Sequence, residues 1–294
     1  MKVVSHDPNN WVKDHPTGLI GFQHMLKGEP NSPDNFMYIL ANQEGDFLMP
    51  VHRHNFDQIR LPISGNMNLG KGLVLKEGQI GYFPEGLSYG PQEDLGKRLQ
   101  LVLQFGGASG YGFMTIEQRR QAMKELSEVG SFEGPYYRRP DGRREWGLNP
   151  VWEQVFGVRL KYPRPRYQHV IIADPKRFNW LPVDHAKNLE HKYMGAFSER
   201  GVWIEMFRTG TNADWTSTDP SARRLFFILS GEGTANNEPL TTFSAVQVDA
   251  GETLNLTASG DMEIFLIGLP PATVPPVEST EFDWKERPEE AAQA

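Results

Sequence analysis

The sequence predicts an all-β protein made of two β-sandwich or barrel domains in tandem, with one or two short helices. Its 294 residues are enough for two domains of ordinary size, each with its own hydrophobic core. Glycine (29 residues) and proline (22 residues) are frequent, which indicates many turns. Short apolar runs separated by Gly, Asn, Asp or Pro recur along the chain, a pattern typical of short strands.

The expected strands form two groups. The first group begins near Ile20 and continues through the apolar runs at 36–40, 47–51, 59–63, 73–75, 80–83 and 99–105. The second group begins at 169–172 and continues at 202–207, 225–229, 243–248 and 262–267. Each group is large enough to form one barrel or sandwich.

One segment between the two groups has a helical pattern. Thr115 can cap the helix, and Gln118 stands three residues later, which is the spacing of a capping box. Ile116, Met123 and Leu126 give an apolar stripe with helical period, and Gly130 can end the helix. We expect this helix to pack against the first barrel.

These patterns predict the domain boundaries. The expected order is an N-terminal segment at 1–16, a first barrel at 17–130, an irregular linker at 131–168, a second barrel at 169–270 and a flexible tail at 271–294. The linker is rich in Gly-Pro and Arg-Pro pairs with interspersed aromatic residues, and the tail is rich in proline and acidic residues.

The two halves share a repeat based on glycines. A Ser-Gly turn ends a strand at Gly65 in the first half and at Gly231 in the second. A further glycine, Gly86 or Gly251, follows 21 or 20 residues later. A repeat of this length indicates duplicated domains.

Two motifs in the first half carry a resemblance to a known family. The segment from His52 to Gly65 resembles the first cupin motif, with two histidines one residue apart and a glycine at the expected distance. Residues 84–89 (Pro-Glu-Gly-Leu-Ser-Tyr) resemble the second cupin motif. The chain is therefore identified as similar to two-domain cupins, which implies two double-stranded β-helix (jelly-roll) barrels. The second half matches only through its strands and glycines.

The resemblance also implies a metal site in the first barrel. His52 and His54 are two residues apart on a strand and therefore project from the same face. In cupins these histidines, a glutamate and a further histidine hold a divalent metal; Gln58 and Tyr89 stand at the last two positions here. One alternative is a divalent transition metal (Fe, Mn, Ni, Cu or Zn) held by His52, His54, Gln58 and Tyr89. The other is no metal, with Gln58 and Tyr89 hydrogen-bonded to the imidazoles.

Arg60 lies two residues beyond Gln58, so its side chain also faces the barrel interior. A buried arginine is costly unless its charge is compensated. We therefore expect Arg60 either to pair with a carboxylate, Asp57 or Glu85, or to bind an anionic substrate.

Two further residues are candidates for substrate contact. Gln104 lies in the middle of an apolar strand, where it can line the interior or be a satisfied core amide. Tyr82, with Phe83 and Tyr89, contributes to an expected aromatic lining.

The equivalent positions of the second half carry Thr218, Pro220, Arg224 and Leu254. These residues do not form a metal-ligand set, and a cationic arginine repels a metal ion. We expect the second barrel to be metal-free and mainly structural.

Composition argues against several other classes of protein. The net charge is −7, and a cluster at Arg138, Arg139, Arg143 and Arg144 is interpreted as a solvated loop, so we expect no nucleic-acid partner. The absence of cysteine excludes disulfides, zinc–thiolate sites and cysteine nucleophiles. No apolar run reaches the roughly 20 residues of a membrane span, and the N-terminus lacks an apolar leader, so we expect a cytoplasmic protein without a membrane partner. Exposed strand edges could pair to form a homodimer.

The functional hypothesis is a cupin-type enzyme that acts on a small oxygenated organic acid or phenolic compound. It could be a metal-dependent dioxygenase or isomerase, with Arg60 orienting an anionic group and Tyr89 as a weak ligand or proton donor. The alternative is a non-catalytic small-molecule-binding or scaffold protein with a decayed metal site. A third hypothesis is a metal-free lyase or isomerase in which Tyr89 and a histidine act as acid and base.

Overall fold

The computed structural model describes residues 1–13, 19–30, 32–94, 96–110, 112–184 and 186–272. These residues form two compact units. One consists mainly of residues 27–172 and contains the first barrel; the other consists mainly of residues 173–272, joined by residues 1–10, and contains the second barrel. Only two α-helices occur among the described residues, beside many antiparallel strands, so the predicted all-β class with one or two short helices is confirmed.

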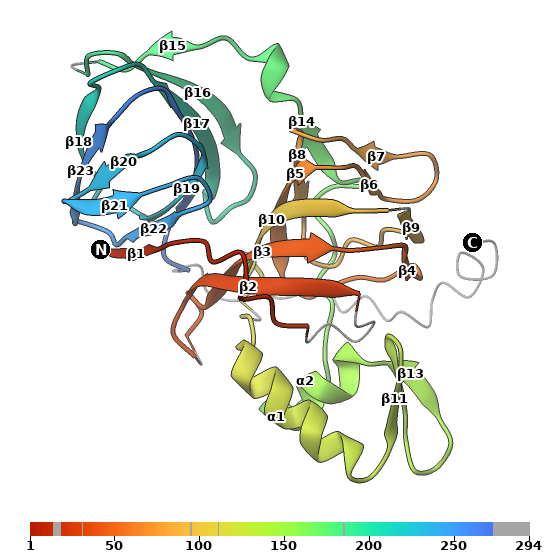
Figure 1. Ribbon diagram of the computed structural model, residues 1–294. Helices are drawn as coiled ribbons and strands as arrows, with labels where there is room; N and C mark the ends of the chain where they lie inside the picture. Colours follow the sequence, from red (N-terminus) through yellow and green to blue (C-terminus); the bar gives the residue numbers. More distant parts are fainter. Residues whose placement is uncertain (14–18, 31, 95, 111, 185, 273–294) are drawn as a thin grey trace. The chain divides into compact units, whose positions relative to one another are not determined.

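The first barrel is built on a six-stranded sheet (Figure 1). Its strands, in sheet order, are β14 (Ile171–Ala173), β8 (Ile80–Phe83), β5 (Asp57–Ser64), β10 (Arg98–Phe105), β3 (Phe36–Gln43) and β2 (Ile20–Lys27). Within this sheet, β3, β10, β5 and β8 pair antiparallel. Two short pairs complete the barrel, namely β4 (Phe47–Met49) with β9 (Gln92–Asp94) and β6 (Met67–Asn68) with β7 (Val74–Leu75).

Two apolar clusters fill the first barrel, and polar side chains are found on the same strands. One cluster includes Met37, Ile39 and Ala41, which are alternate residues of β3, and Val102 of β10. This alternation identifies the inner face of each strand. The second cluster contains Met67, Leu69, Leu75, Phe83, Leu87, Tyr89 and Val170.

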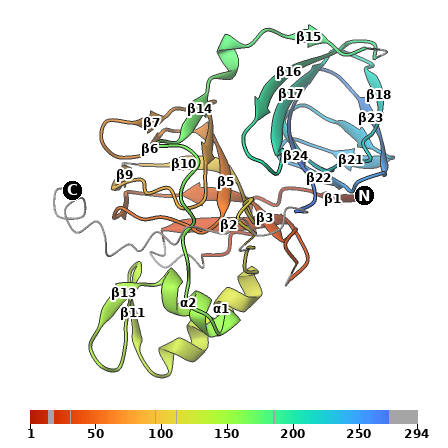
Figure 2. The ribbon, with the colours of Figure 1, turned by 180° about the vertical axis from the view of Figure 1, so that it is seen from behind.

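The predicted helix is confirmed as α1 (Ile116–Ser127). The Thr115 hydroxyl accepts from the Gln118 backbone N–H, and the Gln118 side chain accepts from the Thr115 backbone N–H, so the capping box is complete. A second helix, α2 (Leu148–Phe156), lies beside α1 in both ribbon views (Figure 2).

The segment 131–168 differs from the irregular linker expected from the sequence. It contains a three-stranded antiparallel sheet of β11 (Ser131–Glu133), β12 (Tyr136–Arg138) and β13 (Arg144–Trp146), followed by α2. Tyr137 and Trp152 of this segment are buried in one cluster with Leu126 of α1. Strands of three residues are too short to show alternation in the sequence, so the pattern gave no signal.

The second barrel pairs a seven-stranded sheet with a four-stranded sheet. The larger sheet has the order β1 (Lys2–Val4), β22 (Ala245–Val248), β19 (Arg223–Ser230), β24 (Met262–Leu269), β17 (Trp203–Thr209), β16 (Leu189–Ala196) and β15 (Leu181–Pro182). The smaller sheet has the order β18 (Asp214–Thr218), β23 (Thr253–Ala258), β20 (Gly233–Ala235) and β21 (Glu238–Leu240), and a short 3-10 helix, η1 (Pro175–Arg177), precedes β15 in the chain.

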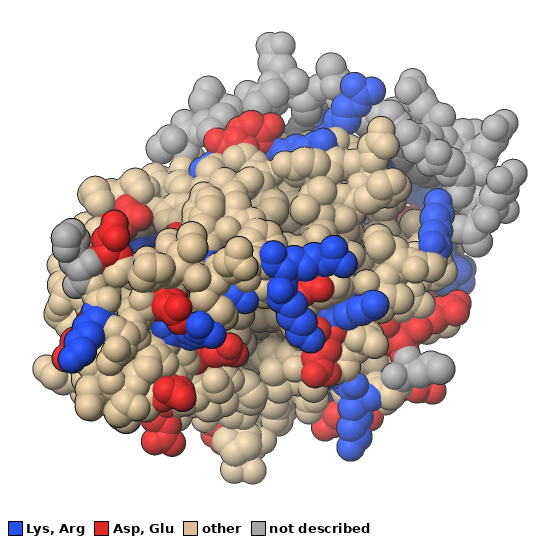
Figure 3. All heavy atoms as spheres, turned by 90° about the horizontal axis from the view of Figure 1, so that it is seen from above, with Lys and Arg blue, Asp and Glu red and all other residues tan. Residues whose placement is uncertain are grey.

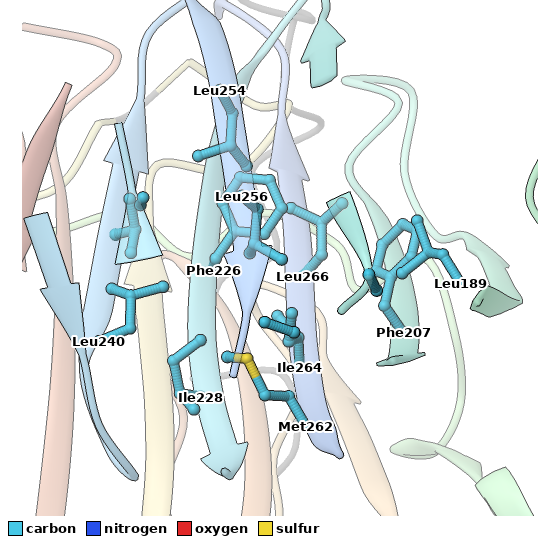
Figure 4. Close-up of a cluster of buried hydrophobic side chains, with 14 of the residues drawn as sticks. Leu189, Phe207, Phe226, Ile228, Leu240, Leu254, Leu256, Met262, Ile264 and Leu266 are labelled. Carbon is cyan, nitrogen blue, oxygen red and sulfur yellow. The ribbon is translucent and has the colours of Figure 1, made fainter. Parts of the chain in front are cut away.

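Large apolar side chains fill the interior of the second barrel (Figure 4). Phe226, Ile228, Ile264 and Leu266 come from two neighbouring strands and are at most 3% exposed. Burial of such side chains gives this barrel an ordinary hydrophobic core.

Two expected boundaries need correction. The N-terminal segment was expected to stand apart, yet Lys2–Val4 forms β1 and pairs with β22 of the second barrel. The strand expected to open the second barrel at residue 169 instead joins the sheet of the first barrel, as β14 beside β8. The expected tail at 271–294 lies, apart from its first two residues, outside the described residues. Among the described residues, no helix has the length and apolar character that a membrane span requires.

The arginine cluster between β12 and β13 is paired with acidic residues. Arg138 and Arg144 contact Glu133, Arg143 contacts Asp141, and Arg139 contacts Glu145 and Glu153. On the face drawn in Figure 3, basic and acidic side chains likewise lie close together.

Candidate functional site

A backbone bridge brings the two predicted metal motifs together. His52 and Tyr89 exchange two backbone hydrogen bonds, each 3.1 Å between N and O. The Gly86 N–H donates to the His54 carbonyl at 2.7 Å. The predicted pairing of the two motifs in one site is therefore present in the structure.

Strand register adds three more side chains. Gln58 and Arg60 of β5 lie opposite Gln104 and Val102 of β10, and Val102 belongs to the interior cluster. Residues paired across a ladder project from the same face, so these side chains share the barrel interior. We call the group His52, His54, Gln58, Arg60, Tyr89 and Gln104 the Arg60 site.

The Gln58 amide has its orientation fixed by Arg60. Its Oε1 accepts from Arg60 Nε at 3.1 Å and Nη2 at 2.7 Å, and from Gln104 Nε2 at 3.4 Å. A guanidinium only donates, so the amide oxygen must face Arg60. The amide nitrogen then faces His54 Nδ1 at 2.8 Å and donates to it.

These contacts assign opposite roles to the two imidazoles. His54 accepts through Nδ1, so the neutral ring carries its proton on Nε2. His52 Nδ1 lies 2.9 Å from the Pro50 carbonyl and donates to it, so its Nε2 holds the lone pair. The rings stand edge to face with centroids 5.1 Å apart. The site thus presents one imidazole acceptor and one imidazole donor.

Both imidazoles are neutral at physiological pH. Burial lowers the pKa of His52 to about 4, and the Arg60 charge also disfavours protonation. Burial also lowers the pKa of His54 well below its ordinary value, with further contributions from His52 and Arg60. The positive charge of the site is therefore carried by Arg60.

Arg60 has only neutral partners. Besides Gln58, its guanidinium donates to the Tyr89 hydroxyl at 3.2 Å and to Met67 Sδ at 3.7 Å. It also lies over the Phe83 ring, 5.1 Å from the centroid. Within the part of the chain that the structure describes, no carboxylate pairs with Arg60.

The carboxylates expected near Arg60 lie elsewhere. Asp57 projects from the opposite face of β5, because neighbouring residues of a strand alternate. Its carboxylate accepts from the Glu85 N–H at 2.7 Å and lies 3.5 Å from Arg166 Nη1. Glu85 accepts from Arg166 Nη2 at 2.7 Å. The expected pairing of Arg60 with Asp57 or Glu85 was wrong.

Tyr82 also lies outside the Arg60 site. It lies opposite Ile59 in the ladder, next to the Gln58–Phe83 pair, so its side chain projects from the other face of the sheet. Its hydroxyl donates to Asp57 Oδ2 at 2.9 Å, and burial raises its pKa. The expectation that Tyr82 lines the substrate site is therefore not supported, for the same reason of strand alternation.

The site also includes Trp146, which the sequence did not assign to it, and Phe83, which was expected in its aromatic lining. Trp146 of β13 stacks on His52, with ring centroids 5.5 Å apart and planes at 21°. Phe83 contacts Tyr89 edge to face at 4.9 Å. Trp146 lies 94 positions from His52 in the chain, so no local motif could have connected them.

The four proposed ligands do not fit a divalent metal. A metal needs a lone pair on Nε2 of both histidines, and His54 carries its proton there. If the His54 proton moved to Nδ1, it would face the N–H of the Gln58 amide, and two donors would meet. If the Gln58 amide turned over instead, its N–H groups would face the Arg60 guanidinium, which only donates. The remaining oxygens, from Gln58 and Tyr89, already accept from the Arg60 cation. Among the described residues, no group of three or more His, Cys, Asp or Glu side chains is arranged to hold a metal ion.

The equivalent positions of the second barrel have different environments. Thr218 and Pro220 are exposed, whereas Leu254 is buried in the apolar core. Arg224 is 2% exposed and donates to Ser217 Oγ at 2.7 Å and to the Glu252 carbonyl at 3.0 Å.

No family model matches the sequence, and no curated protein sequence matches it. Solved structures of similar architecture do exist. A Geobacillus kaustophilus protein, GK1651, is 12% identical with a TM-score of 0.52, covering 93% of this chain and 94% of its own. AerE from Microcystis aeruginosa is 12% identical with a TM-score of 0.50, covering 91% and 96%.

A variant of salicylate 1,2-dioxygenase from Pseudoaminobacter salicylatoxidans is 13% identical with a TM-score of 0.50, covering 83% of this chain and 72% of its own. At such identities the likeness is evidence for the fold alone. Together with the antiparallel barrels described above, it shows that this chain has the fold of two cupin barrels in tandem.

Proposed function

We propose that the first barrel binds a small organic anion through Arg60, without the help of a metal. The observation that supports this is the partly buried guanidinium with neutral partners only. A buried charge without a counter-charge is costly, and an arriving carboxylate would supply the missing charge. The His54 Nε2–H is a further donor suited to a carboxylate oxygen.

The test uses benzoate and benzamide, which share shape and differ in charge. We expect calorimetry to detect benzoate binding and at least about tenfold weaker binding in Arg60→Gln, because a charge-assisted hydrogen bond contributes roughly 1.5–3 kcal/mol. Benzamide should bind more weakly than benzoate by a similar factor. Arg143→Gln, which changes an exposed arginine, is the matched control and should bind like the parent protein. Equal benzoate affinity in Arg60→Gln would contradict the proposal.

A second candidate function is proton transfer on the bound anion. His52 is a neutral base with its lone pair on Nε2, and the Tyr89 hydroxyl accepts from Arg60, which leaves the phenol proton available for donation. His52 could take a proton from a carbon next to a carbonyl while Tyr89 donates to the resulting oxyanion. This chemistry is that of an isomerase or lyase.

Deuterium exchange tests this second candidate. We expect NMR in D2O to show enzyme-dependent exchange of the protons next to the carbonyl of a 2-oxo acid such as pyruvate. Exchange should fall by at least about a hundredfold in His52→Gln and in Tyr89→Phe, within the usual range for general acid–base groups. A chelator should leave the rate unchanged. Binding without exchange would leave the non-catalytic hypothesis in place.

A further inference from the structure

A second set of polar side chains lies inside the first barrel, further along the strands that carry the Arg60 site. Its members are Gln43 of β3, Gln92 and Asp94 of β9, and Arg98 and Gln100 of β10. We call them the inner polar group. Their exposed fractions are only 2–6%, so all of them are buried.

Strand alternation places Gln43, Arg98 and Gln100 inside the barrel. Gln100 is two residues from Val102, and Gln43 is two residues from Ala41; both neighbours belong to the interior cluster. Arg98 lies directly opposite Gln43, and Gln100 lies opposite Ala41.

The two residues of β9 face the same interior. Gln92 lies opposite Met49, and Asp94 lies opposite Phe47. Met49 and Phe47 both belong to the interior cluster. The Glu93 side chain between them is exposed, as alternation requires.

The inner polar group has unused hydrogen-bonding capacity. Gln43 Oε1, Gln92 Nε2, Gln100 Oε1 and Arg98 Nε are buried and have no partner within the described residues. Arg98 forms a buried ion pair with Asp94, so the group as a whole carries no net charge. It therefore offers both donors and acceptors to a neutral, polar ligand group.

The inner polar group lies next to the Arg60 site. Gln100 is two residues along β10 from Val102, which faces Arg60, and this corresponds to about 7 Å along the strand. Burial lowers the pKa of Arg98, and Asp94, Arg60 and Tyr89 lie close enough to influence it as well.

The second barrel shows that the fold does not require these polar residues. Gly65 lies against the backbone of Arg98, and Gly231 lies against the backbone of Met262 in the same way. These matching contacts give the residue correspondence between the two barrels. Arg98 and Gln100 then correspond to Met262 and Ile264, both in the apolar core of Figure 4. By the same alignment, Phe226 takes the position of Arg60.

We propose that the first barrel takes a polyhydroxylated monocarboxylate, a sugar acid, with its carboxylate on Arg60 and its hydroxyl groups on the amides of Gln43, Gln92 and Gln100. This inference rests on the proposed anion binding at Arg60. Amides recognise hydroxyl groups well, because each amide both donates and accepts. The neutral Arg98–Asp94 pair favours hydroxyl groups over a second carboxylate at the inner end.

Calorimetry with D-gluconate, hexanoate and D-glucose tests the proposal. Each probe contains six carbon atoms; hexanoate lacks the hydroxyl groups of gluconate, and glucose, a ring in water, lacks its charge. We expect gluconate to bind at least about tenfold tighter than either of the others. Gln100→Leu should weaken gluconate binding about tenfold and leave hexanoate unchanged, because an apolar side chain of similar length removes only the amide. Gln121→Leu, at an exposed glutamine of α1, is the matched control and should leave binding of all three probes unchanged.

The outcomes separate the two proposals. Hexanoate binding as tightly as gluconate, or unchanged gluconate binding in Gln100→Leu, would overturn the inner subsite and leave anion binding at Arg60 standing. Glucose binding as tightly as gluconate would overturn the role of the carboxylate. Failure of both carboxylates to bind would overturn both proposals. If Gln100→Leu does not give folded protein, as judged by its thermal unfolding, Gln92→Met provides the same comparison.

Discussion

At the scale of single residues, Gln58 determines the chemistry of the first barrel. Its neutral amide leaves the Arg60 charge uncompensated and fixes the His54 proton on Nε2. A carboxylate at the same position would neutralise Arg60 and could accept a hydrogen bond from a His54 Nδ1–H, which would leave the Nε2 lone pair available for a metal. By this reasoning, the identity of one side chain distinguishes the proposed anion site from a metal site on the same backbone.

The double variant Gln58→Glu, Tyr89→His tests this reasoning. It restores the ligand types that the resemblance to cupins implies, so we expect it to bind Ni2+ or Mn2+ with micromolar or better affinity in calorimetry. Its benzoate binding should fall at least about tenfold, because the new carboxylate occupies Arg60. The parent protein should bind neither metal in the same range. Stoichiometric metal in the parent, lost in His54→Ala, would contradict the assignment of the His54 proton.

His52 should make the stability of the protein depend on pH. Its folded-state pKa of about 4 lies below the ordinary value of 6.5, so the unfolded chain binds more protons between these values. The contribution of the neutral His52 ring to the unfolding free energy is full above pH 6.5. It decreases as the pH falls towards 4, by at most roughly 3 kcal/mol.

Urea unfolding at pH 7 and pH 4.5 measures this effect. We expect His52→Gln to lose less stability than the parent protein over this interval. His169→Gln, at an exposed histidine, should behave like the parent. An equal loss in all three proteins would show that His52 is not buried in its neutral form.

At the scale of elements, the loop from β8 to the His52–Tyr89 bridge is held from outside. Arg166 contacts both Asp57 and Glu85, and Glu85 also accepts from the Ser109 N–H at 2.9 Å. Next to Glu85, Gly86 has φ +79° and lies against the Pro163 carbonyl, so the segment around 163–166 packs closely on this loop. The loop in turn positions Tyr89 within the Arg60 site.

Gly86→Ala and Gly78→Ala form a matched pair that tests this packing. Both glycines have nearly the same positive φ, +79° and +76°, so the backbone strain of about 1–2 kcal/mol is shared. A Cβ at Gly86 would lie 1.9 Å from the Pro163 oxygen, whereas a Cβ at Gly78 has nothing within 4 Å. We expect Gly86→Ala to lower the unfolding free energy by at least about 2 kcal/mol more than Gly78→Ala. Equal losses would show that the segment at 163–166 does not press on the loop.

At the scale of the whole molecule, the two barrels use the same strand positions for different purposes. The first barrel places arginine and glutamine side chains where the second places phenylalanine, isoleucine and methionine. The fold therefore does not require the polar interior of the first barrel, which supports the binding role that we propose for it.

Exchanging the polar and apolar side chains at one equivalent position of the two barrels tests this difference. Ile264→Gln should cost about 3–5 kcal/mol, because it removes buried apolar surface and buries an unpaired amide. Gln100→Leu, at the equivalent position, should leave the melting temperature unchanged or raise it, since it removes a buried unpaired carbonyl. Both effects can be read by differential scanning calorimetry. A large loss in Gln100→Leu would show that the amide supports the fold.

The fold and part of the site could be predicted from residue spacing. The capping box at Thr115 depends on residues three positions apart, and the closeness of His52 and His54, whose ring centroids are 5.1 Å apart, follows from their separation of two residues, although neither lies in a regular strand. Arg98 and Gln100 could have been found by the same alternation from Gln104, which was the available signal for the inner polar group. β16, β18 and β23 gave weaker signals, because at least half of each strand is polar or exposed.

By itself, the sequence determined the two-barrel architecture, the capped helix and the two imidazoles and Arg60 as members of one site. Only the tertiary structure decided that Asp57 and Glu85 pair with Arg166, which leaves Arg60 with neutral partners. The reason is that alternation and capping act over a few residues, whereas charge compensation depends on partners more than 80 positions apart in the chain. The sequence could therefore name the groups in the site, and only the fold could show which charge was left for a ligand.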